Sequence, residues 1–178
     1  MSTAAIILAA GASRRLGRPK QLVEIAGEPL VRKIARVALE ACDRVAVIEG
    51  AVSLREPLAG IRVEVVRNSG WEEGIASSIR AGIRWASDAD AVVLLTCDQH
   101  ELAPSHLHAL LAHRFAASRY DGALGIPAVF PRGSFPALLE LEGDRGAKPL
   151  LACATPVDWP GGLHDLDARP DLDAFVRR

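Results

Sequence analysis

Residues 4–22 read A-A-I-I-L-A-A-G-A-S-R-R-L-G-R-P-K-Q-L, and this stretch decides the prediction of the fold. A continuous apolar segment of strand length passes into a loop of small residues, which carries four cations before the first carboxylate, Glu24. A buried strand that ends in Ala-Ala-Gly leaves backbone N–H groups uncovered, and guanidinium and ammonium groups lie within reach of an anion held there. The stretch favours a polyphosphate-binding loop; the alternative is a solvated basic loop after an ordinary strand.

The spacing within this loop excludes the two commonest phosphate-binding motifs. Gly11 and Gly17 are six residues apart, and Lys20 follows Pro19 instead of preceding Ser or Thr, so the loop is not a Walker A motif. It also lacks the G-x-G-x-x-G fingerprint of dinucleotide-binding proteins. An oxidoreductase is therefore disfavoured.

The composition is that of a globular protein. The chain has 178 residues, 49% hydrophobic and 24% charged, which suffices for one domain, residues 1–178, that buries roughly 70% of its unfolded surface. A net charge of -1 argues against nucleic acid or a membrane surface as partner. The odd number of cysteines, their wide spacing and the lack of a signal peptide or spanning segment predict a soluble, cytoplasmic protein.

Alternating strand and helix patterns follow the first loop. An amphipathic helix is expected after Pro29, with Leu30, Ile34 and Ala41 on its apolar face. The further elements are predicted in this order: strand 44–49, strand 61–66, a helix from 72–74 onward, strand 90–96, and a helix from Pro104 with Leu107, Leu110 and Phe115 inside. This alternation predicts an α/β fold with a mostly parallel sheet.

The pattern changes after Tyr120. Residues 121–130 resemble a strand, but Gly125 and Pro127 interrupt it, so a bent or edge strand is expected. A terminal helix is predicted from about Pro170.

Asp98 is the strongest single candidate for a functional residue. It follows strand 90–96, and open α/β sheets bind ligands at the carboxyl ends of their strands. If the first loop holds phosphates, a carboxylate facing it suits Mg²⁺, which takes one or two carboxylates together with phosphate oxygens. The alternative is a structural Asp that caps the turn after the strand.

Two further groups of polar residues have weaker patterns. Asp165 and Asp167 alternate, so on a strand both carboxylates would point to one face and could supply a second metal contact; a solvated acidic turn is the alternative. His106, His108 and His113 fall on or beside the polar side of the helix expected after Pro104, and we predict a solvated surface there.

Five segments in order resemble one family. They are L-A-A-G-A-S-R-R-L-G-R-P-K-Q-L at 8–22, N-S-G-W-E-E-G-I-A-S-S-I at 68–79, C-D-Q at 97–99, G-I-P-A-V-F at 125–130 and G-D-R-G-A-K-P-L-L at 143–151. Together they closely resemble the molybdenum cofactor nucleotidyltransferases. The Ala-Ala-Gly at 9–11 is similar to the CTP-using, cytidylyltransferase branch, whereas the guanylyl branch usually has Ala-Gly-Gly.

The resemblance implies a three-layer, Rossmann-like nucleotidyltransferase fold. The implied reaction is transfer of CMP from CTP to the terminal phosphate of the molybdenum-pterin cofactor, with Mg²⁺ and release of pyrophosphate. The product could pass to a molybdoenzyme. An acceptor phosphate is already ionised, so the reaction needs positioning and charge neutralisation more than a strong general base.

The resemblance also assigns the site residues. Arg14, Lys20 and Asp98 are expected to be catalytic. Asp98, Asp165 and Asp167 are the expected metal ligands. Nucleotide contacts are expected from Leu8, Ala9, Ala10, Gly11, Arg14, Lys20, Asn68, Ser77, Ser78 and Asp98.

Three departures from the family pattern leave the acceptor open. His100 stands where the family commonly has Pro, Ile126 replaces a histidine, and Ala168-Arg169-Pro170 replaces Thr-Pro-Glu. The alternatives are a GTP-using enzyme, an enzyme that acts on a sugar or alcohol phosphate, and a non-catalytic protein that binds and delivers the cofactor.

Overall fold

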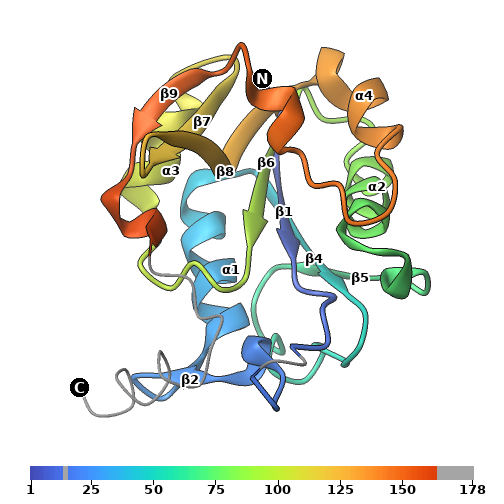
Figure 1. Cartoon of the computed structure of the whole chain (residues 1–178). Coiled ribbons are helices and arrows are strands. Elements are labelled where there is room, and N and C mark those ends of the chain that lie inside the picture. The colour runs from blue at the N-terminus through green and yellow to red at the C-terminus, as the bar shows by residue number, and fades with distance from the viewer. Residues whose placement is uncertain (14–15, 164–178) are drawn as a thin grey trace.

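The protein forms a seven-stranded sheet covered by helices on both faces (Figure 1). The structure, a computed structural model, describes residues 1–13 and 16–163. The order of strands across the sheet is β5 (Glu64–Arg67), β4 (Arg44–Glu49), β1 (Thr3–Leu8), β6 (Ala91–Thr96), β8 (Ala123–Pro131), β7 (Ala116–Tyr120) and β9 (Thr155–Asp158). All pairings are parallel except those of β8 with its two neighbours.

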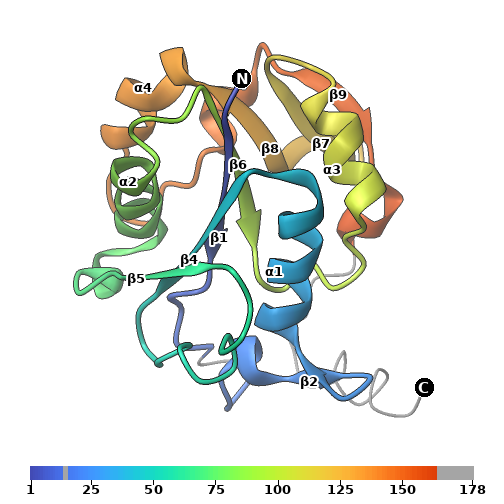
Figure 2. The same ribbon diagram turned by 180° about the vertical axis from the view of Figure 1, so that it is seen from behind.

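The helices form two outer layers. Helices α1 (Leu30–Ala41) and α3 (Pro104–Leu111) cover one face, and α2 (Ile75–Trp85) and α4 (Phe135–Leu139) cover the other, as the two opposite views show (Figures 1 and 2). Short elements complete the described chain: the β2–β3 hairpin (Glu24–Ile25 and Glu28–Pro29) and the 3-10 turns η1 (Lys20–Leu22), η2 (Trp71–Glu73), η3 (Arg132–Ser134), η4 (Lys148–Leu151) and η5 (Pro160–Leu163). Among the described residues, no helix has the length and apolar character needed to cross a membrane.

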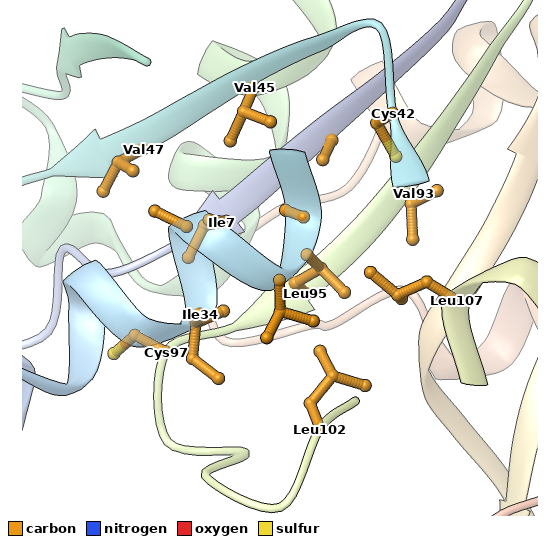
Figure 3. Packing of buried hydrophobic residues seen from close by; sticks show 14 of the residues in the cluster. Ile7, Ile34, Cys42, Val45, Val47, Val93, Leu95, Cys97, Leu102 and Leu107 are labelled. Carbon is orange, nitrogen blue, oxygen red and sulfur yellow. The ribbon is translucent and has the colours of Figure 1, made fainter. Parts of the chain in front are cut away.

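Two hydrophobic cores hold these layers together. Alternate residues of β1 point to opposite faces, so Ile7 packs under α1 and α3 while Ile6 packs under α2. Figure 3 shows the first core, to which Ile34 of α1, Leu107 of α3 and strand residues such as Val93 and Leu95 contribute. Because both faces are buried, the central strands are continuous apolar runs instead of alternating ones.

The predicted α/β fold with a mostly parallel sheet is confirmed. The strand expected at 121–130 is β8, and it is not an edge strand, because it lies between β6 and β7. Gly125 pairs with Ser118 and Ala128 with Ala117, so the ladder is irregular around Ile126 and Pro127. This irregularity accommodates a proline inside the sheet.

Two strands of the seven-stranded sheet, β7 and β9, were not predicted from the sequence. The helix from Pro104 ends at Leu111, before Phe115, which was expected on its inner side. Phe115 instead directly precedes β7 and packs against Phe130 on the opposite face of the sheet. The short β9 was not predicted either. The helix expected from Pro170 lies outside the described residues.

Candidate active site

The candidate site lies where the parallel strands end. Strands β1, β4, β5 and β6 run in the same direction, so their carboxyl ends meet at one edge of the sheet. A cavity of about 370 Å³ opens there. It is lined by Leu8, Ala10, Gly11, Lys20, Trp71, Glu72, Gly74, Ile75, Ser78, Thr96 and Asp144.

The loop after β1 forms the first wall of the cavity. Its start is attached to β4 and to the residues after it, because Ala9 donates its N–H to the carbonyl of Ile48 at 3.1 Å and the carbonyl of Ala10 accepts from the N–H of Ala51 at 2.9 Å. Gln21 of η1, which is fully buried, donates from Nε2 to the carbonyls of Ala9 and Gly11 at 2.7 and 2.6 Å. Sequence reasoning gave Gln21 no role, and nothing in its type or spacing separates it from the surrounding loop residues.

Lys20 and Asp98 meet at the base of this wall. The ammonium of Lys20 forms an ion pair with Oδ2 of Asp98, directly after β6. Asp98 is buried, and its other carboxylate oxygen, Oδ1, has no hydrogen-bond partner among the described residues. A buried oxygen in this state costs free energy unless a ligand satisfies it.

This arrangement fits a divalent cation. Asp98 offers a buried hard oxygen ligand, and no group of three or more His, Cys, Asp or Glu residues within residues 1–13 and 16–163 could enclose an ion. Mg²⁺ is commonly held in this way, by one or two carboxylates with water and phosphate oxygens as the other ligands.

The second wall is built by α2 and the loop before it. The buried side chain of Asn68 donates from Nδ2 to the hydroxyls of Ser77 and Ser78, at 2.8 and 3.0 Å, and accepts from the N–H of Gly70 at 3.1 Å. Ser77 in turn donates to the carbonyl of Gly74 at 2.8 Å. Asn68 therefore anchors the loop that carries Trp71 into the cavity.

A distant loop, residues 142–147, completes this wall. The carbonyl of Gly143 accepts the N–H of Ala76 at 3.1 Å. Gly74 has φ of 111°, and a Cβ there would lie 2.4 Å from Gly143 and 2.6 Å from Oδ1 of Asp144, so only glycine fits. Asp144 and Trp71, which sequence reasoning quoted in motifs without a role, both line the cavity.

The residues predicted for nucleotide binding fall into three groups. Leu8, Ala10, Gly11, Lys20 and Ser78 line the cavity. Asn68, Ser77 and Ala9 do not line the cavity but form hydrogen bonds that hold its walls in place. Asp98 does not line it either, and contacts the lining residue Lys20. Arg14, Asp165 and Asp167 lie outside the described residues.

His106 does not belong to a solvated surface, contrary to expectation. It is buried, stacks on Trp159 with ring centroids 5.0 Å apart, and its Nε2 lies 2.7 Å from Oγ of Ser118. Ser118 donates its hydroxyl hydrogen to the carbonyl of Pro127 at 2.7 Å, so His106 is the donor to Ser118. Burial lowers the pKa of His106 to about 4.

The geometry of the cavity suits an anion with an attached planar or apolar group. Backbone N–H groups of the first loop and the Lys20 ammonium offer positive charge on one side, and Trp71 and Ile75 offer apolar surface on the other. A phosphorylated ligand could therefore span from the end of β1 to the start of α2.

Comparison with known proteins gives a consistent result. A family model described as the MobA-like NTP transferase domain matches residues 5–159. The purine catabolism protein PucB of Bacillus subtilis is 32% identical, over 97% of this chain and 95% of its own length. The molybdenum cofactor guanylyltransferase of Rhodobacter capsulatus is 32% identical, over 74% and 73% of the two chains.

Solved structures are similar over the whole length. The crystal structure of Rv0371c from Mycobacterium tuberculosis matches with a TM-score of 0.86 and 27% identity, covering 100% of this chain and 99% of that one. A crystal structure of Rv0371c in complex with manganese matches with a TM-score of 0.80 and 25% identity, over 99% of each chain.

Proposed function

The chain belongs to the MobA-like NTP transferase family, and on this premise we propose that it transfers CMP from CTP to the terminal phosphate of the molybdenum-pterin cofactor, releasing pyrophosphate. The observation that carries the proposal is the juxtaposition of Lys20, the loop after β1 and the partly unsatisfied carboxylate of Asp98 at one cavity. A triphosphate bound there would meet a cation and backbone N–H groups beside a ligand for a metal.

The chain's own residues would act by positioning and neutralisation. The N–H groups of the loop after β1 and the Lys20 ammonium would hold the β- and γ-phosphates, while Trp71 and Ile75 would take the base and sugar. Asp98 would hold Mg²⁺, which when bound offsets negative charge that develops on the phosphates. The acceptor phosphate would then attack the α-phosphorus in line with the departing pyrophosphate.

No strong base is needed for this step. An acceptor phosphate carries negative charge at neutral pH, so its oxygen attacks without prior removal of a proton. Arg14, Asp165 and Asp167 stay part of the proposal by resemblance alone, the first toward the triphosphate and the two carboxylates toward the metal.

GTP is the second candidate nucleotide. The Ala-Ala-Gly at 9–11 favours CTP, but the relative from Rhodobacter capsulatus is named a guanylyltransferase. Both bases carry an exocyclic amino group, and Asp144 places a carboxylate in the cavity that could accept from either. The recipient of the product would be a molybdoenzyme.

Pyrophosphate release tests the proposal. The four ribonucleoside triphosphates are each supplied with Mg²⁺, with and without molybdenum-loaded pterin cofactor. We expect release only when CTP and the cofactor are present together. Release with GTP alone among the nucleotides would replace CTP by GTP, and tight cofactor binding without any release would favour a carrier protein.

A further inference from the structure

We propose that Gln21 is a positioning residue that sets the polarity of the loop after β1, turning its carbonyl groups inward so that its N–H groups face the phosphates of the nucleotide. The inference rests on the proposed function for the identity of the ligand. Gln21 has an exposed fraction of 0%, so its side chain cannot contact a ligand directly. Its effect must pass through the backbone that it holds.

The carbonyl groups of Ala9, Ala10 and Gly11 are each engaged by the protein. Nε2 of Gln21 donates to the carbonyls of Ala9 and Gly11, at 2.7 and 2.6 Å, and the N–H of Ala51 donates to the carbonyl of Ala10, at 2.9 Å. Within the part of the chain that the structure describes, no acceptor pairs with the N–H of Ala10, Gly11 or Ala12. Successive unpaired N–H groups of this kind form an anion-binding concavity.

The amide of Gln21 fits this arrangement, whereas the carboxylate of a glutamate of the same size does not. Two carbonyl oxygens both require a donor, which the –NH₂ group supplies and a carboxylate cannot. On the other side of the amide, Oε1 lies 3.5 Å from the hydroxyl of Ser13, and that hydroxyl accepts the N–H of Lys20 at 3.0 Å. The same network therefore fixes the backbone of Lys20.

Loss of the amide donors changes what the cavity presents to an anion. The carbonyl of Ala9 would be buried without a partner and that of Gly11 would lose its partner, or their peptide groups would rotate and bring oxygens toward the cavity. Either outcome weakens phosphate binding while leaving the rest of the cavity in place. The loss of binding affinity should therefore be equal for a nucleotide and for a bare phosphate chain.

Arg32 provides a matched control. It also donates to two backbone carbonyls two residues apart, those of Pro57 and Ala59 at 2.9 and 2.8 Å, in a loop that does not line the cavity. Arg32→Met removes the same kind of support from a loop without a proposed ligand. It should leave phosphate binding unchanged.

The experiment measures binding of CTP and of inorganic tripolyphosphate by calorimetry, for the wild type, Gln21→Met, Gln21→Glu and Arg32→Met. Gln21→Met keeps the size of the side chain, and we expect it to weaken both ligands by a similar factor of about ten or more; Gln21→Glu should weaken them further. In the enzymatic reaction, KM for the nucleotide should rise and KM for the acceptor should not.

Other outcomes separate this inference from the proposed function. If the wild type binds both ligands and Gln21→Met binds them equally well, or loses only CTP, the role of Gln21 is wrong while the function stands. If the wild type binds neither ligand, both fail.

An NMR experiment on the wild type tests the same inference without depending on the folding of a variant. On addition of tripolyphosphate the amide resonances of Ala10, Gly11 and Ala12 should shift in the NMR spectrum, while the side-chain amide protons of Gln21 stay protected from exchange. Unmoved loop resonances would overturn the inference.

Discussion

Two clusters of wholly or partly buried polar side chains differ in how completely their hydrogen bonds are satisfied. In the cleft cluster, Lys20 and Asp98 leave one carboxylate oxygen without a partner in the described residues. In the sheet cluster, His106 and Ser118, the hydroxyl of Ser118 both accepts and donates within the protein. Because an unsatisfied buried atom costs free energy, its persistence points to a ligand, whereas a satisfied pair is explained by stability alone.

The largest expected effect comes from the cleft cluster. Asp98→Ala should lower turnover in the pyrophosphate-release assay about a hundredfold or more, because it removes a preorganised charge next to the phosphates. Its free energy of unfolding should change by less than about 1 kcal/mol, since the partly exposed Lys20 can turn to water. Asp88→Ala, which breaks a surface ion pair with Arg44, is the control and should leave turnover unchanged. Near-normal turnover of Asp98→Ala would remove this residue from the site.

The sheet cluster should instead respond to pH. Burial lowers the pKa of His106 to about 4 from an ordinary value of 6.5, so between these values the unfolded chain binds a proton that the folded protein excludes. The contribution of His106 to stability is therefore complete above pH 6.5 and declines as the pH falls, by about 2 kcal/mol between pH 8 and pH 5. Urea unfolding of the wild type and of His106→Leu should show the difference between them shrinking by that amount. A constant difference would mean that His106 titrates normally.

Ser118→Ala should separate stability from activity within the sheet cluster. It leaves Nε2 of His106 and the carbonyl of Pro127 without their partner, so the free energy of unfolding should fall by about 2 kcal/mol. Turnover per folded molecule should stay within about twofold of the wild type. Ser105→Ala, on the exposed side of α3, is the control for the loss of a hydroxyl. A hundredfold loss of turnover would extend the site into the sheet.

The smallest effect is expected at the mouth of the cleft. A Cβ at Gly11 would meet no atom of the protein within 4 Å, but it would occupy part of the cavity. Gly11→Ala should therefore fold normally and raise KM for the nucleotide about tenfold. Gly133→Ala, where a Cβ likewise meets nothing, should leave KM unchanged. Equal KM values for the two variants would indicate that the phosphates lie elsewhere.

Much of the fold could be predicted from the sequence, because its signals are local. The apolar run of β1 and the helical spacing of α1 and α2 each depend on short-range periodicity. β7 was missed because Ala116-Ala117-Ser118 carries no strand-like alternation, and its burial between two other strands overrides propensity.

The candidate site likewise contains residues that could be predicted from the sequence and residues that could not. Gly11, Lys20 and Asp98 could be named from strand ends and residue type, since these are the positions where parallel sheets bind ligands. Asp144 could not, because its place in the cavity depends on the contact of its loop with Gly74, about seventy residues earlier. Gln21 could not either, because a buried amide that serves two carbonyls has no sequence signature.

The approach of Gly143 to Gly74 has a consequence for synthesis on the ribosome. A nascent chain that has not yet emerged as far as Gly143 can form β1 and α2, but the N–H of Ala76 lacks its acceptor and one wall of the cleft is missing. The complete cleft, and the stabilisation that a nucleotide bound in it would give, therefore forms only after about the first four fifths of the chain has emerged.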